Sequence, residues 1–394
     1  MEAVTDVVFR HVVKQAGAPD VFFTEFANAT GWVHAGDKAI AGRLIKTDDE
    51  HPLVAQIWGG EPGDMEQFAA HCAQLGFDSI DINMGCPAKS AIKSGGAALI
   101  HQPDVAVAAI AAAKTAGLPV SVKTRLGYTY VDEWCEWLTT ILQQDIANLT
   151  IHLRTKKEMS KVPAHYEFID DIIKLRDEIA PQTLLTINGD IRDRAHGEEL
   201  TRQHPGVNGI MIGRGVFSDP FCFRASRAVS QKKSGLALAG PGLFYDDTRE
   251  MGNTYAKLEA VDCSQITSAS AERSLSISSG DTSEKSTPAQ ERGAGDTDFA
   301  DDVRGVSEAI RKEHSEEAEL SITTRKTELI ALLHYHLDLF DRYQPTLGRP
   351  FETLKRFFKI YIRDFDGAKE LREKLMHTKN TSEVRQILEE IQYL

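Results

Sequence analysis

The sequence predicts a (β/α)8 TIM barrel that lacks its first strand at the N-terminus, followed by a small C-terminal all-α helical bundle. Two observations indicate the barrel. Short apolar segments alternate with amphipathic helical segments, and polar or glycine residues follow strand after strand at the same end. Three segments with helical apolar spacing indicate the bundle. A doubly wound open sheet is the weaker alternative, because no GxGxxG turn follows any strand.

Composition narrows the class of protein. The chain has 394 residues, of which 42% are hydrophobic, and a net charge of −13. No apolar run is long enough to span a bilayer and no export signal is visible, so we expect a cytoplasmic protein without a membrane partner. The five cysteines are scattered and form no CxxC pair, so we expect no metal site. We also expect a monomer. The acidic total argues against a nucleic-acid partner unless basic residues are concentrated locally.

The chain begins with a loop and a helix. Asp6 is placed to cap a helix that runs through Phe9 and Ala16. Seven strand segments follow, whereas a barrel of this type has eight. We therefore expect the missing strand just before Met1. Its absence leaves two sheet edges.

Strand and helix segments alternate along the predicted barrel. The strand segments are short, apolar and bounded by turn residues, as expected for buried parallel strands. They are Val21 to Glu25, Leu53 to Trp58, Ser79 to Met84, Val120 to Thr124, Leu149 to Leu153, Leu184 to Asn188 and Gly209 to Ile212. The helices are expected at Asp64 to Leu75, Val105 to Ala116, Val131 to Gln144, Glu167 to Glu178 and Arg192 to Gln203, with a final barrel helix at Phe217 to Arg227.

Changes in composition divide the chain into three regions. Residues 1–230 form the predicted barrel domain. Residues 231–324 are rich in small polar and acidic residues, with 10 Lys and Arg against 18 Asp and Glu. Such a segment buries too little apolar surface to offset the entropy of ordering it, so we expect a mostly disordered insertion or linker, with a helix near Asp301 to Glu319. Residues 325–394 form the predicted helical domain.

Apolar residues recur at helical spacing in three segments of the helical domain. The sets are Leu329, Leu332, Leu333, His336, Leu337 and Phe340; then Phe351, Leu354, Phe358, Tyr361 and Ile362; then Val384, Ile387, Leu388 and Ile391. In the second segment, helical spacing puts four cations near one face, namely Lys355, Arg356, Lys359 and Arg363. Such a stripe is usually solvated surface. The functional interpretation is contact with a phosphate backbone, which needs little more than placed cations.

The segment from Ser79 to Pro87 is predicted to be a buried strand that ends in a tight turn carrying a thiol. Apolar and polar residues alternate along it, and Gly85 and Pro87 then end the pairing. Cys86 is left at the carboxyl end of the strand, where parallel α/β folds place their chemistry. A buried structural cysteine is the alternative, since that is the commonest fate of a free thiol.

Polar and glycine residues follow six strands in one register. They are Gln56-Ile57-Trp58-Gly59, the Cys86 turn with Lys89, Lys123-Thr124-Arg125, His152-Leu153-Arg154, Asn188-Gly189-Asp190 and Gly213-Arg214-Gly215. Any one of these is ordinary at a strand end, but six together indicate a site. If one strand is missing, the last two follow strands seven and eight, where such barrels often bind phosphate. A phosphate-bearing cofactor fits that corner, with Lys123 and His152 across the barrel mouth.

These motifs, together with Met1-Glu2-Ala3-Val4-Thr5-Asp6, Phe9-Arg10 and Asn83-Met84-Gly85-Cys86-Pro87, resemble the tRNA-dihydrouridine synthase family. The helical tail is similar to that family's C-terminal RNA-binding domain. The resemblance implies an FMN-dependent barrel that reduces uridine in tRNA to 5,6-dihydrouridine with NADPH or NADH. It implies a proton-donor role for Cys86. It also implies FMN contacts at Met1, Gln56, Lys123, His152, Asn188, Gly189, Asp190, Gly213 and Arg214.

The implied chemistry suits these residue types. Hydride from reduced flavin adds to C6 of the uracil, and a nearby acid protonates C5. The target base must leave the folded tRNA to reach the barrel. Candidates to hold the uracil or the adjacent phosphate are Asn83, Lys89, Arg125 and Arg154. Two alternatives remain open: an FMN barrel acting on a free pyrimidine or enone, and a catalytically impaired RNA-binding form that lacks the first strand.

Overall fold

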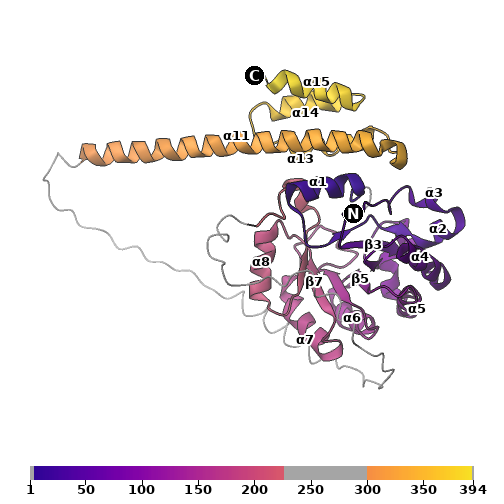
Figure 1. Cartoon of the computed structure of the whole chain (residues 1–394). Coiled ribbons are helices and arrows are strands. Elements are labelled where there is room, and N and C mark those ends of the chain that lie inside the picture. The colour runs from indigo at the N-terminus through magenta and orange to yellow at the C-terminus, as the bar shows by residue number, and fades with distance from the viewer. Residues whose placement is uncertain (1–3, 226–299, 393–394) are drawn as a thin grey trace, which may run out of the picture. The chain divides into compact units, whose positions relative to one another are not determined.

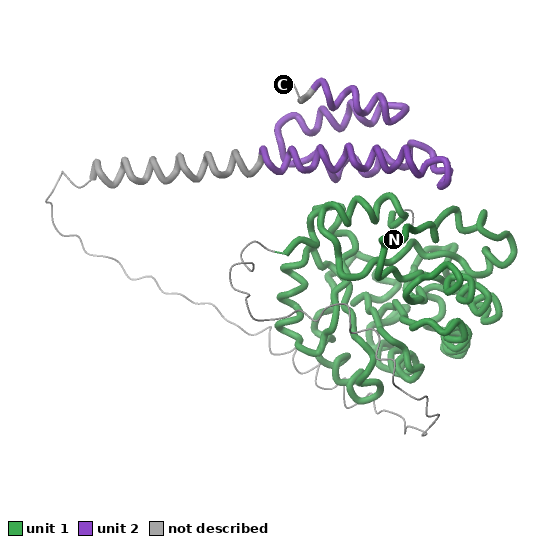
Figure 2. The backbone as a smooth tube through the Cα atoms, viewed as in Figure 1, with its two compact units in different colours: residues 1–271 green, residues 272–394 purple. Residues whose placement is uncertain are grey.

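The structure is a computed structural model that describes residues 4–225 and 300–392, including the side chains of residues 4–225 and 323–390. The chain divides into two compact units, Met1–Ala271 and Glu272–Leu394 (Figure 2). Met1 and residues 231–299 of the predicted linker lie outside the described residues. Within the described part no single helix is long and apolar enough to cross a membrane, and one bent pair, Ala91–His101 with Pro103–Lys114, passes only by length and composition.

One parallel sheet forms the centre of the first unit. Its strands pair in the order β1–β3–β4–β5–β6–β7–β8, and β2 also pairs with β3. They are β1 (Phe22–Phe23), β2 (Ala27–Asn28), β3 (Leu53–Trp58), β4 (Ser79–Asn83), β5 (Val120–Arg125), β6 (Asn148–His152), β7 (Leu184–Asn188) and β8 (Gly209–Met211). β1 and β2 are successive pieces along the same side of β3. Each of the seven predicted strand segments coincides with an observed strand, so these predictions are confirmed.

Helices surround the strands of the first unit (Figure 1). They are α1 (Val7–Gly17), α2 (Ala29–Ala35), α3 (Asp37–Ile40), α4 (Pro62–Gln74), α5 (Pro103–Lys114), α6 (Trp134–Leu142), α7 (Ile169–Ile179), α8 (Arg194–Gln203) and α9 (Gly215–Ser218). The five crossover helices expected between Asp64 and Gln203 are confirmed as α4 to α8. The sequence did not predict α2 and α3, because both are short and carry little apolar repeat.

The sheet curls like part of a TIM barrel, and helical segments bring its two ends together. Phe9 of α1 stacks on Phe217 of α9 with ring centroids 6.1 Å apart. Arg224 donates from Nε to the Ala16 carbonyl at 2.6 Å. Among the described strands, β8 pairs only with β7, and β1 and β2 pair only with β3. The parallel α/β fold is therefore confirmed, as a barrel-like sheet with two unpaired edges.

The first helix is fixed at both its start and its inner face. Asp6 caps α1 as predicted, and its side chain accepts a hydrogen bond from the Phe9 amide at 2.9 Å. The guanidinium of Arg10 is buried and makes a bidentate pair with Glu50, at 2.6 and 3.0 Å. It also donates to the carbonyls of Thr5 and Ile45, at 2.8 Å each. The contacts of Arg10 with Ile45 and Glu50 hold α1 against the segment before β3.

The final barrel helix predicted at Phe217 to Arg227 is wrong within the described residues. α9 ends at Ser218, and Asp219 is extended with φ −151° and ψ 112°. Pro220 explains the stop, because its ring disfavours helical geometry in the preceding residue and it has no amide hydrogen.

The second unit is helical, which confirms the predicted C-terminal helices. Its helices are α11 (Ala300–Leu347), α12 (Glu352–Lys355), α13 (Phe358–Tyr361), α14 (Ala368–Met376) and α15 (Thr381–Gln392). α11 includes the helix expected near Asp301 to Glu319 and continues past residue 324, where the linker was expected to end. α14 was missed, although Ala368, Leu371 and Leu375 are buried on it at helical spacing.

The second predicted amphipathic helix is interrupted. Its residues form two single turns, α12 and α13, separated at Arg356 and Phe357. Lys355 lies in α12 and Lys359 in α13, while Arg363 follows α13. The expectation that the four cations share one continuous helical face is therefore wrong. His336 of α11 and Tyr361 of α13 are both buried, with Nδ1 and the hydroxyl oxygen 2.6 Å apart.

Candidate active site

Cys86 stands in the turn after β4 and is held there by the side chain of Asn83. The Asn83 Oδ1 accepts hydrogen bonds from the amides of Gly85 at 3.1 Å and Cys86 at 3.0 Å. This turn ends the strand and sets the direction in which the thiol leaves the backbone. The Cys86 carbonyl accepts from the Ala97 amide at 3.1 Å, which joins the turn to the loop before α5.

Cys86 differs from the other free cysteines that the structure describes. Cys72 and Cys222 are buried, and burial raises the pKa of each thiol to about 12. Cys86 is half-buried and lies beside Lys123 and Arg125. The structure therefore gives Cys86 the accessibility that a reacting thiol needs and that a core cysteine lacks.

Lys123 projects from β5 beside this turn. Its Nζ donates to the Asn188 Oδ1 at 3.2 Å, which joins β5 to the end of β7. Burial, together with repulsion from Arg125, lowers the pKa of Lys123 to about 8, against attraction from Asp81 and Cys86. The ammonium remains the main form at neutral pH. It can therefore stabilise negative charge that develops on a group bound beside it.

Polar side chains form a row across β3, β4 and β5, at the level of β4 that precedes the Cys86 turn. Gln56, Asp81 and Ser121 are direct neighbours in the register of β3, β4 and β5. Asp81 accepts from the Gln56 Nε2 and from the Ser121 hydroxyl, each at 2.7 Å. The Asn83 Nδ2 donates to the Gln56 Oε1 at 3.2 Å. The side chain that holds the Cys86 turn is thereby connected to a buried carboxylate.

A second network joins the ends of β6, β7 and β8. Arg154 donates from Nη1 to the His152 Nε2 at 3.1 Å and from Nη2 to Asp190. Arg214 donates to the other oxygen of Asp190 at 3.1 Å. Although burial raises the pKa of Asp190, the hydrogen bonds from Arg154 and the Ala164 amide hold it below its usual value. The Asp190 carboxylate thus joins the loops after β6, β7 and β8. The last two are the loops predicted to bind phosphate.

His152 is neutral in this network. Burial lowers the pKa of His152 to about 2, and the surrounding cations, with Lys123 first among them, act in the same direction. Because its Nε2 accepts from Arg154, the ring proton resides on Nδ1. His152 can therefore donate a hydrogen bond but adds no charge to the site.

Gly189 allows the loop after β7 to approach His152 closely. Its φ is +128°, and an added Cβ would lie 3.0 Å from the Ala164 Cβ and 3.2 Å from the His152 Cδ2. A side chain would therefore displace the imidazole. The Tyr166 hydroxyl donates to the Gly189 carbonyl at 2.6 Å, which fixes this loop further.

Arg125 braces the Cys86 turn. Its Nε donates to the Gly85 carbonyl at 2.7 Å, and its Nη1 donates to the carbonyls of Thr155 and Met159 at 3.0 and 3.2 Å. Burial lowers its pKa to about 10. Arg125 therefore remains charged and connects the turn after β4 to the long loop after β6.

The structure brings most of the predicted site residues to one end of the sheet. Its two networks contain Gln56, Asn83, Cys86, Lys123, Arg125, His152, Arg154, Asn188, Gly189, Asp190 and Arg214. Gly213 lies between β8 and α9, and Lys89 is exposed in the turn beyond Cys86. Asp81, Ser121 and Tyr166 were missed. Alternation along β4 was a signal for Asp81, because it shares a face with Asn83.

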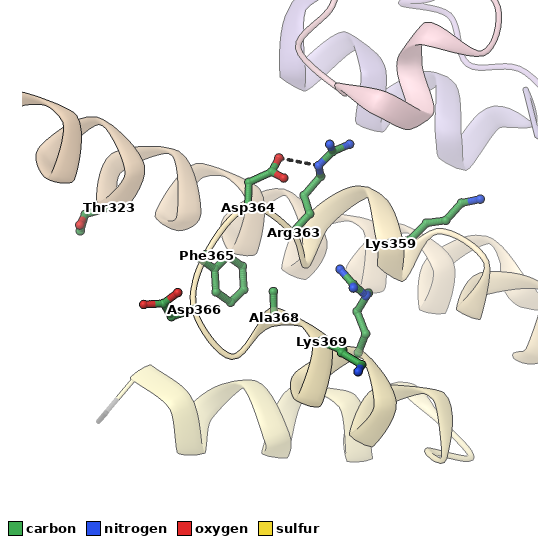
Figure 3. Close-up of a pocket in the computed structure, with 9 residues that line it drawn as sticks. Thr323, Lys359, Arg363, Asp364, Phe365, Asp366, Ala368 and Lys369 are labelled. Carbon is green, nitrogen blue, oxygen red and sulfur yellow. Dashed lines mark hydrogen bonds and ion pairs between the residues drawn. The ribbon is translucent and has the colours of Figure 1, made fainter.

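The second unit has a surface depression of about 860 Å³ whose lining includes four cations and two carboxylates (Figure 3). Its lining residues are Thr323, Lys359, Arg363, Asp364, Phe365, Asp366, Ala368, Lys369 and Arg372. Arg363 is paired with Asp364 at 2.6 Å. Lys355 and Arg356 lie elsewhere, over the rings of Phe351 and Phe357 at 5.4 and 4.8 Å. Two of the four predicted cations therefore share this depression with Lys369 and Arg372, which were not predicted.

Comparison with known proteins identifies relatives along the whole chain. A probable tRNA-dihydrouridine synthase 2 of Bacillus subtilis is 45% identical over 394 residues, covering 100% of this chain and 92% of that protein. A probable tRNA-dihydrouridine synthase of Staphylococcus aureus is 41% identical over 394 residues, covering 100% and 91%. One of Staphylococcus epidermidis is 41% identical over 391 residues, covering 99% and 91%.

Likeness to solved structures is slight. A variant of NCR from Zymomonas mobilis superposes with a TM-score of 0.35 at 16% identity, covering 55% of this chain and 78% of that one, and this adds nothing to the description of the fold. The model of the dihydrouridine synthase family, in contrast, matches residues 1–240, which include every residue of the two networks. The chain therefore belongs to the dihydrouridine synthase family.

Proposed function

We propose that the chain is a tRNA-dihydrouridine synthase, an FMN-dependent enzyme that reduces the C5=C6 bond of uridine in tRNA with NADPH or NADH. The observation that supports this most is the half-buried Cys86 thiol, fixed by Asn83 beside Lys123 and Arg125 at the carboxyl end of β4. Full-length similarity to proteins named for this activity adds to it.

The residues at the strand ends fit a flavin with a polar ring edge and an anionic tail. Gln56 and Lys123 would hold the ring edge, and His152, Asn188, Gly189, Asp190, Gly213 and Arg214 would hold the remainder of FMN. Gly189 suits this role because its φ of +128° lets the loop after β7 pack closely against His152, another proposed FMN contact. Arg214 is 66% exposed, so its guanidinium can contact an anion while paired with Asp190. When bound, FMN would supply the hydride that adds to C6 of the uracil.

Cys86 would give the proton that completes the reduction. Addition of hydride at C6 leaves an electron pair at C5, and transfer of the thiol proton to C5 yields the saturated ring. The Asn83 turn orients the thiol for this step. Lys123 would stabilise negative charge that builds up beside it, because it remains an ammonium at neutral pH.

The neighbouring cations differ in how many of their N–H groups already bond to the protein, and we propose different substrate roles for them on that basis. Within the described residues the Nη2 of Arg125 makes no hydrogen bond, so it can contact a uracil carbonyl. Arg154 is engaged with Val162, His152 and Asp190, so we propose that it holds His152 and Asp190 in place. Lys89 is exposed and can meet a phosphate near the flipped base.

We propose that the second unit binds the tRNA backbone. Lys359 and Arg363 support this because they line a depression with two further cations, Lys369 and Arg372. Lys355 and Arg356 are proposed to contact phosphates outside that depression. The monomeric state and the cytoplasmic location stay predictions.

We also propose that the sheet is a (β/α)8 barrel lacking its first strand. The sheet has seven strand positions from the edge β1/β2 to the edge β8, both included, and contacts of α1 with Phe217 and Arg224 bring these edges toward each other. A strand between the edges would complete eight. A peptide with alternating apolar residues that adds in register should slow hydrogen exchange of the edge amides of β1 and β8. Unchanged exchange at saturating peptide would contradict this arrangement.

The function is tested by incubating the purified chain with FMN, NADPH and tRNA lacking dihydrouridine. Nucleoside mass spectrometry should detect a gain of two mass units on uridine. The same incubation with free uridine tests the alternative that the chain reduces free pyrimidines. Reduction of free uridine without reduction of tRNA would contradict the proposed function.

A further inference from the structure

Asp81 is a buried carboxylate to which the proposed chemistry assigns no role. Its side chain lies in the middle of β4 and is 0% exposed. It shares a face of the strand with Asn83, opposite to Ile80 and Ile82, which belong to the apolar core. Burying a carboxylate is costly unless its oxygens accept hydrogen bonds, and both do so here.

A chain of hydrogen bonds connects Asp81 to the Cys86 turn. In each of these bonds the donor lies on the side of the Cys86 turn and the acceptor on the side of Asp81. The Oδ2 of Asp81 accepts from the Gln56 Nε2, which turns the Gln56 Oε1 toward the Asn83 Nδ2. The Asn83 Oδ1 is then left to accept from the backbone amides of Gly85 and Cys86. The backbone amides can only donate and Oδ2 only accepts, so the two ends of the chain of hydrogen bonds determine how both amide side chains point.

We propose that Asp81 is a positioning residue that sets the orientation of the Gln56 carboxamide and, through Asn83, the geometry of the Cys86 turn. This inference rests on the proposed function for its significance, because Cys86 is the proposed proton donor. The hydrogen-bond geometry that it describes does not depend on the proposed function. Only Oδ2 must accept, so the arrangement also holds if a proton resides on Oδ1, with Ser121 then accepting from it.

Because only Oδ2 of Asp81 must accept a hydrogen bond, two substitutions of Asp81 are expected to differ in their effect. Asp81→Asn keeps an oxygen toward Gln56 and places its amide toward Ser121, so the chain of hydrogen bonds survives. Asp81→Leu is similar in size but removes the acceptor, so the Gln56 carboxamide loses its fixed orientation and Asn83 releases the Cys86 amide. Ser121→Ala is the matched control, because it removes the other hydrogen bond of Asp81 and leaves the chain to Cys86 intact.

The test is the rate of alkylation of Cys86 by iodoacetamide, measured on the Cys86 peptide by mass spectrometry in the folded full chain. Loss of one hydrogen bond is expected to make alkylation of Asp81→Leu about tenfold faster, with faster hydrogen exchange at Gly85 and Cys86. Asp81→Asn and Ser121→Ala should remain within about twofold of the native rate. A purely structural role would lower the thermal midpoint in Asp81→Leu and Ser121→Ala alike and leave alkylation unchanged.

Two results would overturn the inference: a native alkylation rate in Asp81→Leu, or an equal acceleration in Asp81→Asn. If Asp81→Leu does not fold, Gln56→Met breaks the next link and must also accelerate alkylation, and a native rate there overturns the inference equally. Alkylation requires neither FMN nor tRNA. A chain that fails to reduce tRNA but shows the expected alkylation pattern therefore contradicts the proposed function and not the role of Asp81.

Discussion

Lys123 shows how burial tunes a single residue of this site. Its pKa of about 8 lies below its ordinary value of 10.5, because burial disfavours the charged form. The unfolded chain therefore binds more protons than the folded chain between these two values, and the folded chain gains stability as the pH rises through that range. Below pH 8 the full cost of the buried ammonium is present.

We therefore predict that Lys123→Met is more stable than the native chain at pH 7, by about 3 kcal/mol at most. The difference should shrink as the pH rises from 8 to 10.5. Urea unfolding at a series of pH values measures it. A difference that is constant with pH would show that the ammonium is not strained by burial.

At this scale the sequence predicted the turn that carries Cys86 better than the side chains that support it. The Cys86 turn was predicted because glycine and proline beside a strand end are local signals. Asp81 and Tyr166 were missed because their partners, Gln56 and Gly189, are distant in sequence. The engagement of Arg154 with three partners depends on the loop after β6, which carries no periodic signal.

Helix α1 is the element that draws the ends of the sheet together, and Arg10 anchors it. The ion pair of Arg10 with Glu50 is buried. Lys14, also on α1, pairs with Asp49, and the two side chains are 38% and 62% exposed. Removing one partner of a buried pair leaves an uncompensated charge, while an exposed pair contributes little.

Arg10→Met is expected to lower the free energy of unfolding of the first unit by about 3–5 kcal/mol. Lys14→Met is the matched control and should change it by about 1 kcal/mol or less. Chemical denaturation of the full chain, followed by a probe in the first unit, measures both. Equal effects would mean that the burial of the Arg10 pair has no energetic consequence.

In the second unit, the His336–Tyr361 contact joins α11 to the single turn α13. Burial lowers the pKa of His336 to about 3, so the contact is between neutral groups. Tyr361→Phe removes the hydrogen bond between the hydroxyl and Nδ1 of the buried imidazole and should destabilise α13 by about 1–3 kcal/mol. Tyr335→Phe is the control, because its hydroxyl makes no hydrogen bond within the described residues.

Hydrogen exchange of the α13 amides measures this change in the intact chain. Exchange should be faster in Tyr361→Phe and native in Tyr335→Phe. Native exchange in both variants would show that packing alone holds α13.

Long periodic elements were predicted well and short ones poorly. The seven predicted strands and α4 to α8 have apolar runs of clear period and were found, whereas the two-residue strand β2 was not predicted. The helix expected through Arg227 failed at Pro220, although proline is a stop signal in the sequence itself. The break between α12 and α13 could not be read, because Leu354, Phe358 and Tyr361 keep helical spacing across it.

At the scale of the whole molecule, an acidic chain is proposed to bind an acidic polymer. The net charge of −13 is a sum over the chain, whereas Lys359, Arg363, Lys369 and Arg372 are concentrated on one depression. Phosphate contacts are local and are weakened by salt, because binding releases counterions. Sequence counting located two of these cations, and the fold was needed for the two on α14.

Lys359→Ala is expected to weaken tRNA binding and to reduce the slope of log Kd against log salt by about one unit. Lys374→Ala is the control, since Lys374 is exposed on α14 but does not line the depression. Filter binding at several salt concentrations measures both. Identical slopes for the two variants would place the tRNA contact elsewhere.

The most direct test of the account is the Cys86→Ala variant, assayed for two products at once. It should retain bound flavin and oxidise NADPH, while dihydrouridine formation in tRNA falls by about 100-fold or more, as expected when a proton donor is removed. Cys222→Ala, which removes a buried free thiol, should keep dihydrouridine formation. Native dihydrouridine formation in Cys86→Ala would contradict the account.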